Sequence, residues 1–375
     1  MFEMRHIAFV LLALTFAPAV AAVQTPSRQT IEEAARKTSP HSTDEALKYF
    51  EAEFARKTAE AANRVYDPNA PAAANPPRTP WGAPDLRGYY LTATYTPLER
   101  PKAITKPLYT VDEAIRAFMY ASRADVSVDP ATVHYDWKEF GMEAWQSPVR
   151  PNLRTSLIVD PPDGRIPPMT PAAQRRRADA AAQAKARNPQ TSVRTLGNTE
   201  TRCIVGDGAI PLVQGGSPGS NSVGSEVTTE IQIFQTADHL TIVHQSMTQV
   251  RIIPVDGRPR LPRSIRAWVG DSRGRWEGNT LVVDTTNFND RSPDTNFQGS
   301  TDALELVERF TVVDANTLRY EYTVTDPTTW TRPWSVEAPL PRIGPPIYEF
   351  ACHEQNYGLI NVVTGARTGE KANSR

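Results

Sequence analysis

The C-terminal half of the chain is an almost continuous series of short β-type segments separated by turn sequences. Between Thr228 and Val363, β-branched and aromatic residues alternate with polar ones, and tight-turn residues interrupt them. The expected strands are 230–235, 240–253, 275–276, 281–283, 304–313 and 318–324. The turns Glu277-Gly278-Asn279-Thr280 and Asp314-Ala315-Asn316-Thr317 suit antiparallel hairpins. The pattern predicts a mainly β fold, an antiparallel barrel or strongly curved sheet of lipocalin-like type, with accessory N-terminal helices.

The N-terminus has the pattern of a secretory signal peptide. Arg5 and His6 precede the apolar run Ile7–Phe16, and Ala19-Val20-Ala21 provides a small-residue cleavage site. The apolar run is about half the roughly twenty residues that a membrane-spanning helix needs. We therefore expect residues 1–21 to be removed, the mature protein to be periplasmic or secreted, and no membrane span to follow.

Helix signals precede the β region and suggest domain boundaries. Capping-box spacings occur at Thr30 with Glu33, Ser42 with Glu45 and Thr110 with Glu113, and Thr170-Pro171 is a further helix start. The expected organisation is a signal peptide at 1–21, a helical segment at 22–66, a Pro/Ala-rich linker at 67–80, a mixed strand and helix part at 81–200, an antiparallel β domain at 201–367 and a tail at 368–375.

The charge balance excludes one large class of partner. Lys and Arg number 41 against 42 Asp and Glu, so the net charge is −1. Without a basic field, a polyanion is not held by counterion release, and we expect no nucleic-acid partner. Phosphate-loop, dinucleotide-binding and common hydrolase motifs are absent from the sequence, so it indicates no cofactor. It assigns no oligomeric state.

The chain contains two cysteines, Cys203 and Cys352, which are 149 residues apart. In an exported protein, an oxidising compartment favours a disulfide over a metal site or a nucleophile. We expect the two cysteines to be bridged, the alternative being two separately buried thiols.

Several long motifs resemble a widespread family of secreted bacterial proteins to which no activity is attached. These motifs are Thr79–Gly88, Arg154–Arg165, Arg251–Arg258, Gly270–Gly278, Asp326–Trp330 and Tyr348–Glu354. The similarity extends from Thr79 to Arg367 and implies export. The Trp276–Leu281 hairpin and the opening Asp85–Tyr89 are also similar to lipocalin-type barrels, a short resemblance that does not assign a function.

Three side chains in the β region are candidates for catalysis. Strand alternation places His244 on one face with Leu240 and Ile242, pointing inward, where an imidazole is either a core residue or a general acid or base. With a four-residue loop at Asp314–Thr317, Arg309 faces Tyr322, and its neighbour Glu308 faces Thr323. A guanidinium in that position needs either an internal salt bridge or an anionic ligand.

The candidate ligand-binding residues are Trp276, Trp330, Arg251, Tyr322 and His353. The two tryptophans either fill a core or line an apolar pocket, and Arg251 is a candidate for an ion network or a polar contact in that pocket. His353 is expected on a strand with Glu349, at the rim. The imidazoles lack zinc-ligand spacing, so no metal is expected.

The leading hypothesis is an exported soluble protein that binds a small apolar or aromatic ligand in a barrel-like pocket. The second is a metal-independent periplasmic hydrolase, lyase or isomerase in which His244 is the acid or base and Arg309 stabilises negative charge. The third is an envelope interaction protein without a ligand. A cavity beside His244 distinguishes the second from the first, and a filled interior favours the third.

Overall fold

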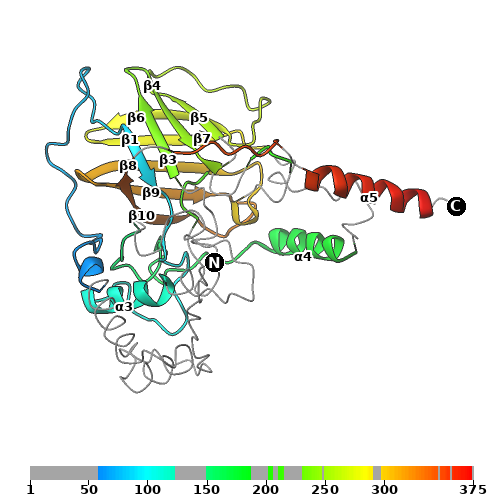
Figure 1. Cartoon of the computed structure of the whole chain (residues 1–375), viewed down its shortest axis with the longest axis horizontal. Coiled ribbons are helices and arrows are strands. Elements are labelled where there is room, and N and C mark those ends of the chain that lie inside the picture. The colour runs from blue at the N-terminus through cyan, green and yellow to red at the C-terminus, as the bar shows by residue number, and fades with distance from the viewer. Residues whose placement is uncertain are drawn as a thin grey trace, which may run out of the picture. The chain divides into compact units, whose positions relative to one another are not determined.

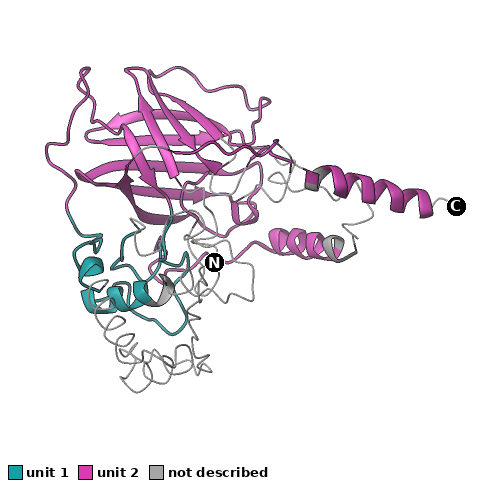
Figure 2. Cartoon of the chain, viewed as in Figure 1, with its two compact units in different colours: residues 1–70, 93–157, 215–227 teal, residues 71–92, 158–214, 228–375 magenta. Residues whose placement is uncertain are grey.

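The computed structural model describes residues 58–122, 149–186, 202–205, 210–214, 230–246, 249–289, 297–344, 347–354 and 357–373. The predicted signal peptide and the helix starts at Thr30 and Ser42 lie outside these residues. The chain divides into two compact units: unit 1 comprises residues 1–70, 93–157 and 215–227, and unit 2 comprises residues 71–92, 158–214 and 228–375 (Figure 2).

Unit 2 is built on one antiparallel sheet of ten strands, which confirms the mainly β prediction. The hydrogen-bonded order is β5-β4-β3-β1-β10-β9-β8-β7-β6, and β2 pairs with β10 beside this path (Figure 1). The strands are β1 (Gly88–Leu91), β2 (Ile158–Asp160), β3 (Glu230–Gln235), β4 (His239–His244), β5 (Gln249–Pro254), β6 (Asp271–Glu277), β7 (Thr280–Thr286), β8 (Glu305–Asp314), β9 (Thr317–Thr325) and β10 (Trp334–Ile343). The single strand predicted at 240–253 is in fact two strands, β4 and β5, and β4 ends at His244.

The sheet is strongly curved but not closed. Among the described residues no backbone ladder joins β5 to β6, the two ends of the order. Side chains connect these ends instead. A Cβ added to Gly274 on β6 would lie 2.7 Å from Val255 Cγ1 and 3.2 Å from Ile253 Cγ2. Only a residue without a side chain permits this approach, so Gly274 allows the curvature that brings β5 over β6.

The concave face of the sheet holds the hydrophobic core of unit 2. Alternate residues of the strands point to this side and are buried. They include Leu281, Val283, Leu306, Phe310, Leu318, Tyr320, Tyr322, Val324, Trp334, Val336, Ala338 and Leu340. Phe297, in a short 3₁₀ turn (Phe297–Gly299), stacks on Trp334 with ring centroids 5.6 Å apart. Large aromatic side chains therefore fill the described part of the interior.

A β-bulge in β8 overturns the predicted register of the β8–β9 hairpin. Asp314 pairs with Thr317 as the turn sequence predicts, but the register shifts between Val312 and Asp314. One extra residue on one strand moves every later pair by one position. Arg309 therefore faces Glu321, and Glu308 faces Tyr322. The predicted pairing of Arg309 with Tyr322 is wrong for this reason.

The described helices agree with the sequence signals except at the C-terminus. α3 (Val111–Ser122) begins with the predicted capping box, in which Thr110 N donates to Glu113 Oε2 at 2.8 Å and Glu113 N donates to Thr110 Oγ1 at 3.3 Å. α4 (Pro171–Ala186) begins after Thr170, whose Oγ1 accepts from Ala173 N at 3.1 Å.

The predicted β structure up to Val363 is wrong beyond β10. Residues 347–354 are irregular, and Tyr357–Asn373 form the helix α5. Strand propensity of the Val362-Val363 pair favoured the wrong assignment, whereas the spacing of Leu359, Val363 and Ala366 fits a helix. His353 therefore does not share a strand face with Glu349.

The predicted disulfide between Cys203 and Cys352 is present, with S–S 2.02 Å and Cα–Cα 5.7 Å. It ties the segment 202–205 to the irregular segment before α5. Among the described residues no helix has the length and apolarity needed to cross a membrane.

We predict that replacing both cysteines by serine lowers the free energy of unfolding by roughly 5 kcal/mol, because the bridge closes a very long loop in the unfolded chain. Urea unfolding of the oxidised wild-type protein and of the double variant measures the difference. The oxidised protein, denatured without a reductant, should also give no reaction with a thiol reagent. Two reactive thiols in that assay would contradict the bridge.

Candidate functional site

A buried ion pair lies in the interior of unit 2. Arg251 on β5 and Glu308 on β8 have side chains 4% and 0% exposed, and their ion pair joins Nη2 to Oε2. A second contact runs from Arg251 Nη1 to Glu308 Oε1 at 3.0 Å. This two-point geometry matches the planar guanidinium to the carboxylate. The pair connects the strand at one end of the sheet order to a strand near the other end.

Hydroxyl groups satisfy the remaining donors and acceptors of this pair. Arg251 Nε donates to Ser272 Oγ at 2.9 Å, and Nη2 donates to Thr285 Oγ1 at 2.8 Å. Tyr320 OH donates to Glu308 Oε1 at 2.8 Å. A buried charge pair is stable only when its other hydrogen-bonding groups also have partners, as they do here. We therefore assign the Arg251 cluster, defined as Arg251, Glu308, Ser272, Thr285 and Tyr320, to structure.

The two interior tyrosines bind a segment that lies inside the sheet. Leu212 N donates to Tyr320 OH at 3.1 Å, and Tyr322 OH donates to Val213 O at 2.9 Å. Burial, reinforced by the negative charge of Glu308, raises the pKa of both phenols well above the usual value. Both tyrosines therefore stay protonated and can make these bonds. Tyr322, a predicted ligand contact, thus holds part of the chain.

Arg309 lies on the outer face of the sheet. Its side chain is 42% exposed, and Nη1 donates to Glu277 Oε2 at 3.0 Å. Arg275 also contacts Glu277, with Nε 3.1 Å from Oε1, and forms an ion pair with Asp284. The structure does not bring Arg309 together with His244 as the enzyme hypothesis requires. The bulge in β8 places the neighbouring carboxylate, Glu308, inside instead.

His244 points inward with Leu240 and Ile242, as strand alternation predicts, and is 3% exposed. Its Nδ1 accepts from Ser246 N at 3.1 Å. Nε2 is sealed from solvent and has no hydrogen-bond partner among the described residues. Burial lowers the pKa of the imidazole to about 4. At neutral pH His244 is therefore uncharged, with its proton on Nε2, and it lacks a free basic nitrogen.

The other predicted ligand contacts do not gather around one cavity. Trp330 is 2% exposed and packs edge-to-face on Trp334 with centroids 5.5 Å apart. Trp276 is half-buried near the turn of the β6–β7 hairpin, opposite Leu281. His353 is exposed in the irregular segment beside the disulfide. We find Trp330 in the core, whereas Trp276 and His353 lie in separate surroundings.

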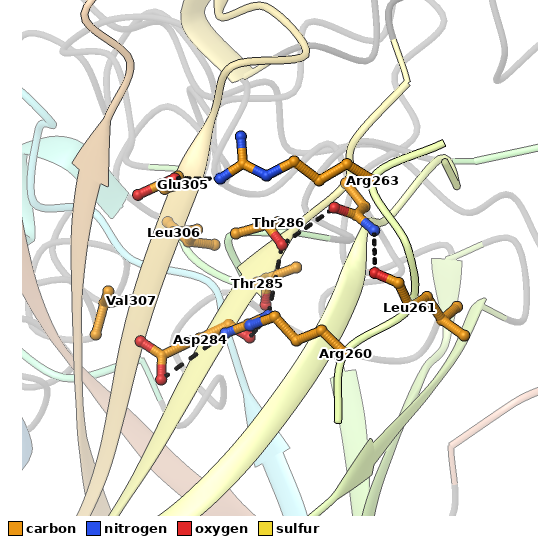
Figure 3. A pocket seen from close by; sticks show the side chains of 10 residues that line it. Arg260, Leu261, Arg263, Asp284, Thr285, Thr286, Glu305, Leu306 and Val307 are labelled. Atoms are coloured by element: carbon orange, nitrogen blue, oxygen red, sulfur yellow. Dashed lines mark hydrogen bonds and ion pairs between the residues drawn. The ribbon is translucent and has the colours of Figure 1, made fainter. Parts of the chain in front are cut away.

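An open pocket lies on the opposite, outer face of β7 and β8 (Figure 3). Its volume is about 400 Å³. One wall is the connection between β5 and β6, which contributes Arg260, Leu261 and Arg263. The other wall and the floor come from the two strands and the end of β7, with Asp284, Thr285, Thr286, Asn287, Glu305, Leu306 and Val307.

The wall formed by the β5–β6 connection is held in place by hydrogen bonds. Asn287 Nδ2 donates to the carbonyls of Leu261, Pro262 and Ile265 at 3.2, 3.1 and 3.1 Å. Leu261 N donates to Asp271 Oδ2 at 3.0 Å. Asn287 has φ 61°, a conformation that asparagine tolerates better than most residues. The backbone of this wall is thereby preorganised.

Two loose ion pairs cross the pocket. Arg260 Nη2 is 4.0 Å from Asp284 Oδ2, and Arg263 Nη2 is 3.8 Å from Glu305 Oε1. Both distances exceed hydrogen-bond length. Arg260 is fixed by bonds from Nη1 to the carbonyls of Asp271 and Asp284, each 3.2 Å. Arg263 is 90% exposed and Glu305 54% exposed, so both can turn toward a ligand.

Sequence patterns alone do not indicate this pocket. Its two arginines, Arg260 and Arg263, belong to a run of four arginines between Arg258 and Arg266. This run of arginines is the feature of the sequence that could have indicated a cationic site in the β5–β6 connection. The carboxylates opposite come from β7 and β8, and the alternation of those strands predicts their common outward face but not which loop covers it.

Comparison with known proteins adds no assignment to this site. No family model, no curated protein and no solved structure matches the chain. Within the described residues, no group of three or more His, Cys, Asp or Glu side chains is arranged to hold a metal ion. The site must therefore be interpreted from its own chemistry.

We predict that Glu308→Leu and Arg251→Met each lower the free energy of unfolding by about 3–5 kcal/mol, because each leaves one buried charge without its partner. The double variant Arg251→Met/Glu308→Leu should be more stable than either single variant. Arg332→Gln breaks the exposed pair with Asp160 and should change stability by about 1 kcal/mol or less. Denaturant unfolding of all five proteins provides the comparison. Additive effects of the two single changes would contradict the pairing.

We predict that the His244 imidazole titrates with a midpoint near pH 4 in NMR spectra of the folded protein. Its folded pKa is below the unfolded value of 6.5, so the unfolded chain binds the proton first as the pH falls. Stability from this group is complete above pH 6.5 and is lost between pH 6.5 and 4, by roughly 3 kcal/mol. His244→Gln should remove that part of the pH dependence. A midpoint at the ordinary value would contradict the buried, unpartnered imidazole.

Proposed function

We propose that the protein binds a small zwitterion, a molecule with separate cationic and anionic groups, in the outer pocket of Figure 3. This proposal keeps the expected class, a small-molecule binder, but changes the site and the polarity of the ligand. The observation that carries it is the ion pair between Arg263 and Glu305, which spans the pocket at 3.8 Å without closing to a hydrogen bond. Arg260 stands 4.0 Å from Asp284, whose carboxylate is already paired with Arg275.

Because the ion pair across the pocket is too long for a hydrogen bond, a ligand that carries both a positive and a negative group fits it better than a ligand with one charge. A ligand carboxylate can accept from the Arg263 guanidinium, while a ligand ammonium group can donate to Glu305. Each contact replaces a separation of 3.8 Å by a charge-assisted hydrogen bond. An anion alone would leave Glu305 without its cation, and a cation alone would leave Arg263 without its anion. α-Amino acids and short peptides have the required pattern.

The dimensions and lining support a ligand of that size. About 400 Å³ lies within the range of roughly 300–1,000 Å³ usual for small-molecule sites. Val307 supplies apolar surface, and Thr286 supplies a hydroxyl. The bonds from Asn287 fix the loop wall, so less conformational entropy is lost on binding.

The interior hypotheses receive less support. An apolar ligand between the tryptophans would have to displace Trp334 and Phe297, which stack on each other. Acid or base catalysis by His244 requires a reactive nitrogen that a substrate can reach, whereas Nδ1 accepts a backbone bond and Nε2 is sealed. The interaction hypothesis gains from the filled interior, but it does not explain the charged outer pocket.

We also propose that the protein works outside the cytoplasm, in the periplasm or in the secreted fraction. The disulfide between Cys203 and Cys352 supports this localisation, because such bridges persist in oxidising compartments. The N-terminal pattern of a basic start, an apolar run and small residues adds to it.

We predict that isothermal titration of the mature protein with a panel of free α-amino acids and dipeptides gives saturable binding for at least one of them. N-acetylated and C-amidated forms of that ligand, each lacking one charge, should bind at least tenfold more weakly. Arg263→Gln should reduce the preference for the free carboxylate over the amide, and Glu305→Gln the preference for the free amine over the acetylated form.

The matched control is Arg177→Gln, which removes an exposed arginine on α4 and should leave the affinity unchanged. Failure of the wild-type protein to bind any member of the panel would overturn the proposal. It would also be overturned if both pocket variants bound the ligand as tightly as the wild type.

A further inference from the structure

Unit 1 contains a buried arginine without an acidic partner. Arg100 is 7% exposed. Its single described bond runs from Nε to Thr155 Oγ1 at 3.1 Å. Nη1 and Nη2 have no partner among the described residues, and neither is sealed from solvent in the way that His244 Nε2 is. The guanidinium therefore has its two terminal nitrogens free and within reach of a small solute.

The hydroxyl that holds Arg100 does not neutralise its charge. Thr155 is fully buried, and its Oγ1 donates to Lys106 O at 2.8 Å or Pro107 O at 3.1 Å while accepting from Arg100. Among the described carboxylates of the neighbouring segments, Glu99 and Asp112 are exposed, and Glu113 is 2.5 and 2.7 Å from Lys106 Nζ and accepts from Thr110 N. The Glu113 carboxylate already has its cation.

The backbone around Arg100 is fixed from both sides. Leu157 N donates to Pro97 O at 2.8 Å, and Thr155 N donates to Pro107 O at 3.0 Å. The segment that carries Arg100 is thus attached before and after it to the extended chain 152–157. The orientation of the guanidinium follows from these attachments and from the Nε bond, and an oriented cation can select a ligand by geometry.

The chain segments that carry Arg100 and Thr155 contain several other buried polar side chains. Thr94, Thr96, Asn152 and Ser156 in unit 1 are all at least nine-tenths buried. Asn152 Oδ1 accepts from Arg154 N at 2.9 Å, but Nδ2 is sealed without a partner among the described residues. Unit 1 thus buries several hydroxyls, an amide donor and a cation, a composition more typical of a ligand site than of a core.

We propose that Arg100 is the anchor of an oxyanion site in unit 1, separate from the outer pocket of unit 2. An unpaired buried cation is strongly unfavourable, and a bound anion removes that penalty. Because Nε is occupied, Nη1 and Nη2 face the ligand end-on as a parallel pair. That geometry accepts two oxygens of one carboxylate, phosphate or sulfate group.

The test is thermal unfolding and isothermal titration of the full mature protein with sodium phosphate, sulfate or acetate, against sodium chloride at equal ionic strength. At least one oxyanion should raise the unfolding temperature saturably, while chloride should not. The three salts distinguish a phosphate-type ligand from a carboxylate. Arg100→Lys keeps the charge but loses the paired donors, so its affinity should fall at least tenfold.

Arg100→Met distinguishes an anion site from a purely structural arginine. In chloride buffer it should unfold at the same temperature as the wild type or higher, because it removes an uncompensated buried charge, and it should lose the oxyanion effect. Arg177→Met and Arg263→Gln should retain that effect, which separates this site from the outer pocket. An equal response of wild type, Arg100→Lys and Arg100→Met to every salt would overturn the proposal. So would a wild type that responds to none of them.

Discussion

The ion pair between Arg251 and Glu308 is the interaction on which the architecture of unit 2 depends. The curved sheet lacks a backbone ladder between its end strands among the described residues, so side chains must hold those ends together. Arg251 does so by contacting β6, β7 and β8 through Ser272, Thr285 and Glu308. Tyr320 extends the network to Leu212. Curvature, interior packing and the position of the internal segment thus share one set of hydrogen bonds.

The two faces of the sheet divide the charged residues by their chemistry. On the concave face, charge is paired at short range and every hydroxyl near it is used, so those groups are unavailable to a ligand. At the pocket on the outer face, Arg263 stands 3.8 Å from Glu305 and Arg260 stands 4.0 Å from Asp284, and these side chains remain partly exposed. Water screens the outer pairs and makes them weak, which leaves them free to exchange partners. The same residue types therefore stabilise the fold inside and offer binding groups outside.

Local sequence patterns predicted the hairpins well, because turn residues and strand alternation act over a few positions. Gly278 and Asn279 at the β6–β7 turn, Thr170 before α4 and the inward side of His244 all follow from such patterns. The β8 bulge does not, since its single extra residue has no distinctive sequence, and it exchanged the expected positions of Glu308 and Arg309. The helix α5 was missed because its two adjacent valines favour a strand locally. The outer pocket was missed because it forms between segments distant in sequence.

The separation between a saturated interior and an adjustable exterior has a consequence for how this protein can change. Substitutions at Arg263 or Glu305 alter exposed side chains on a wall whose backbone is fixed by Asn287 and Asp271. Such changes leave the Arg251 cluster and the aromatic core intact, so they carry little penalty in folding. Homologous chains or laboratory libraries could diversify the recognition chemistry of this surface one residue at a time, as antibody loops do on their conserved framework. A new binding site in the interior would instead require several residues of the Arg251 cluster to be replaced together, because each of them depends on the others for its hydrogen bonds.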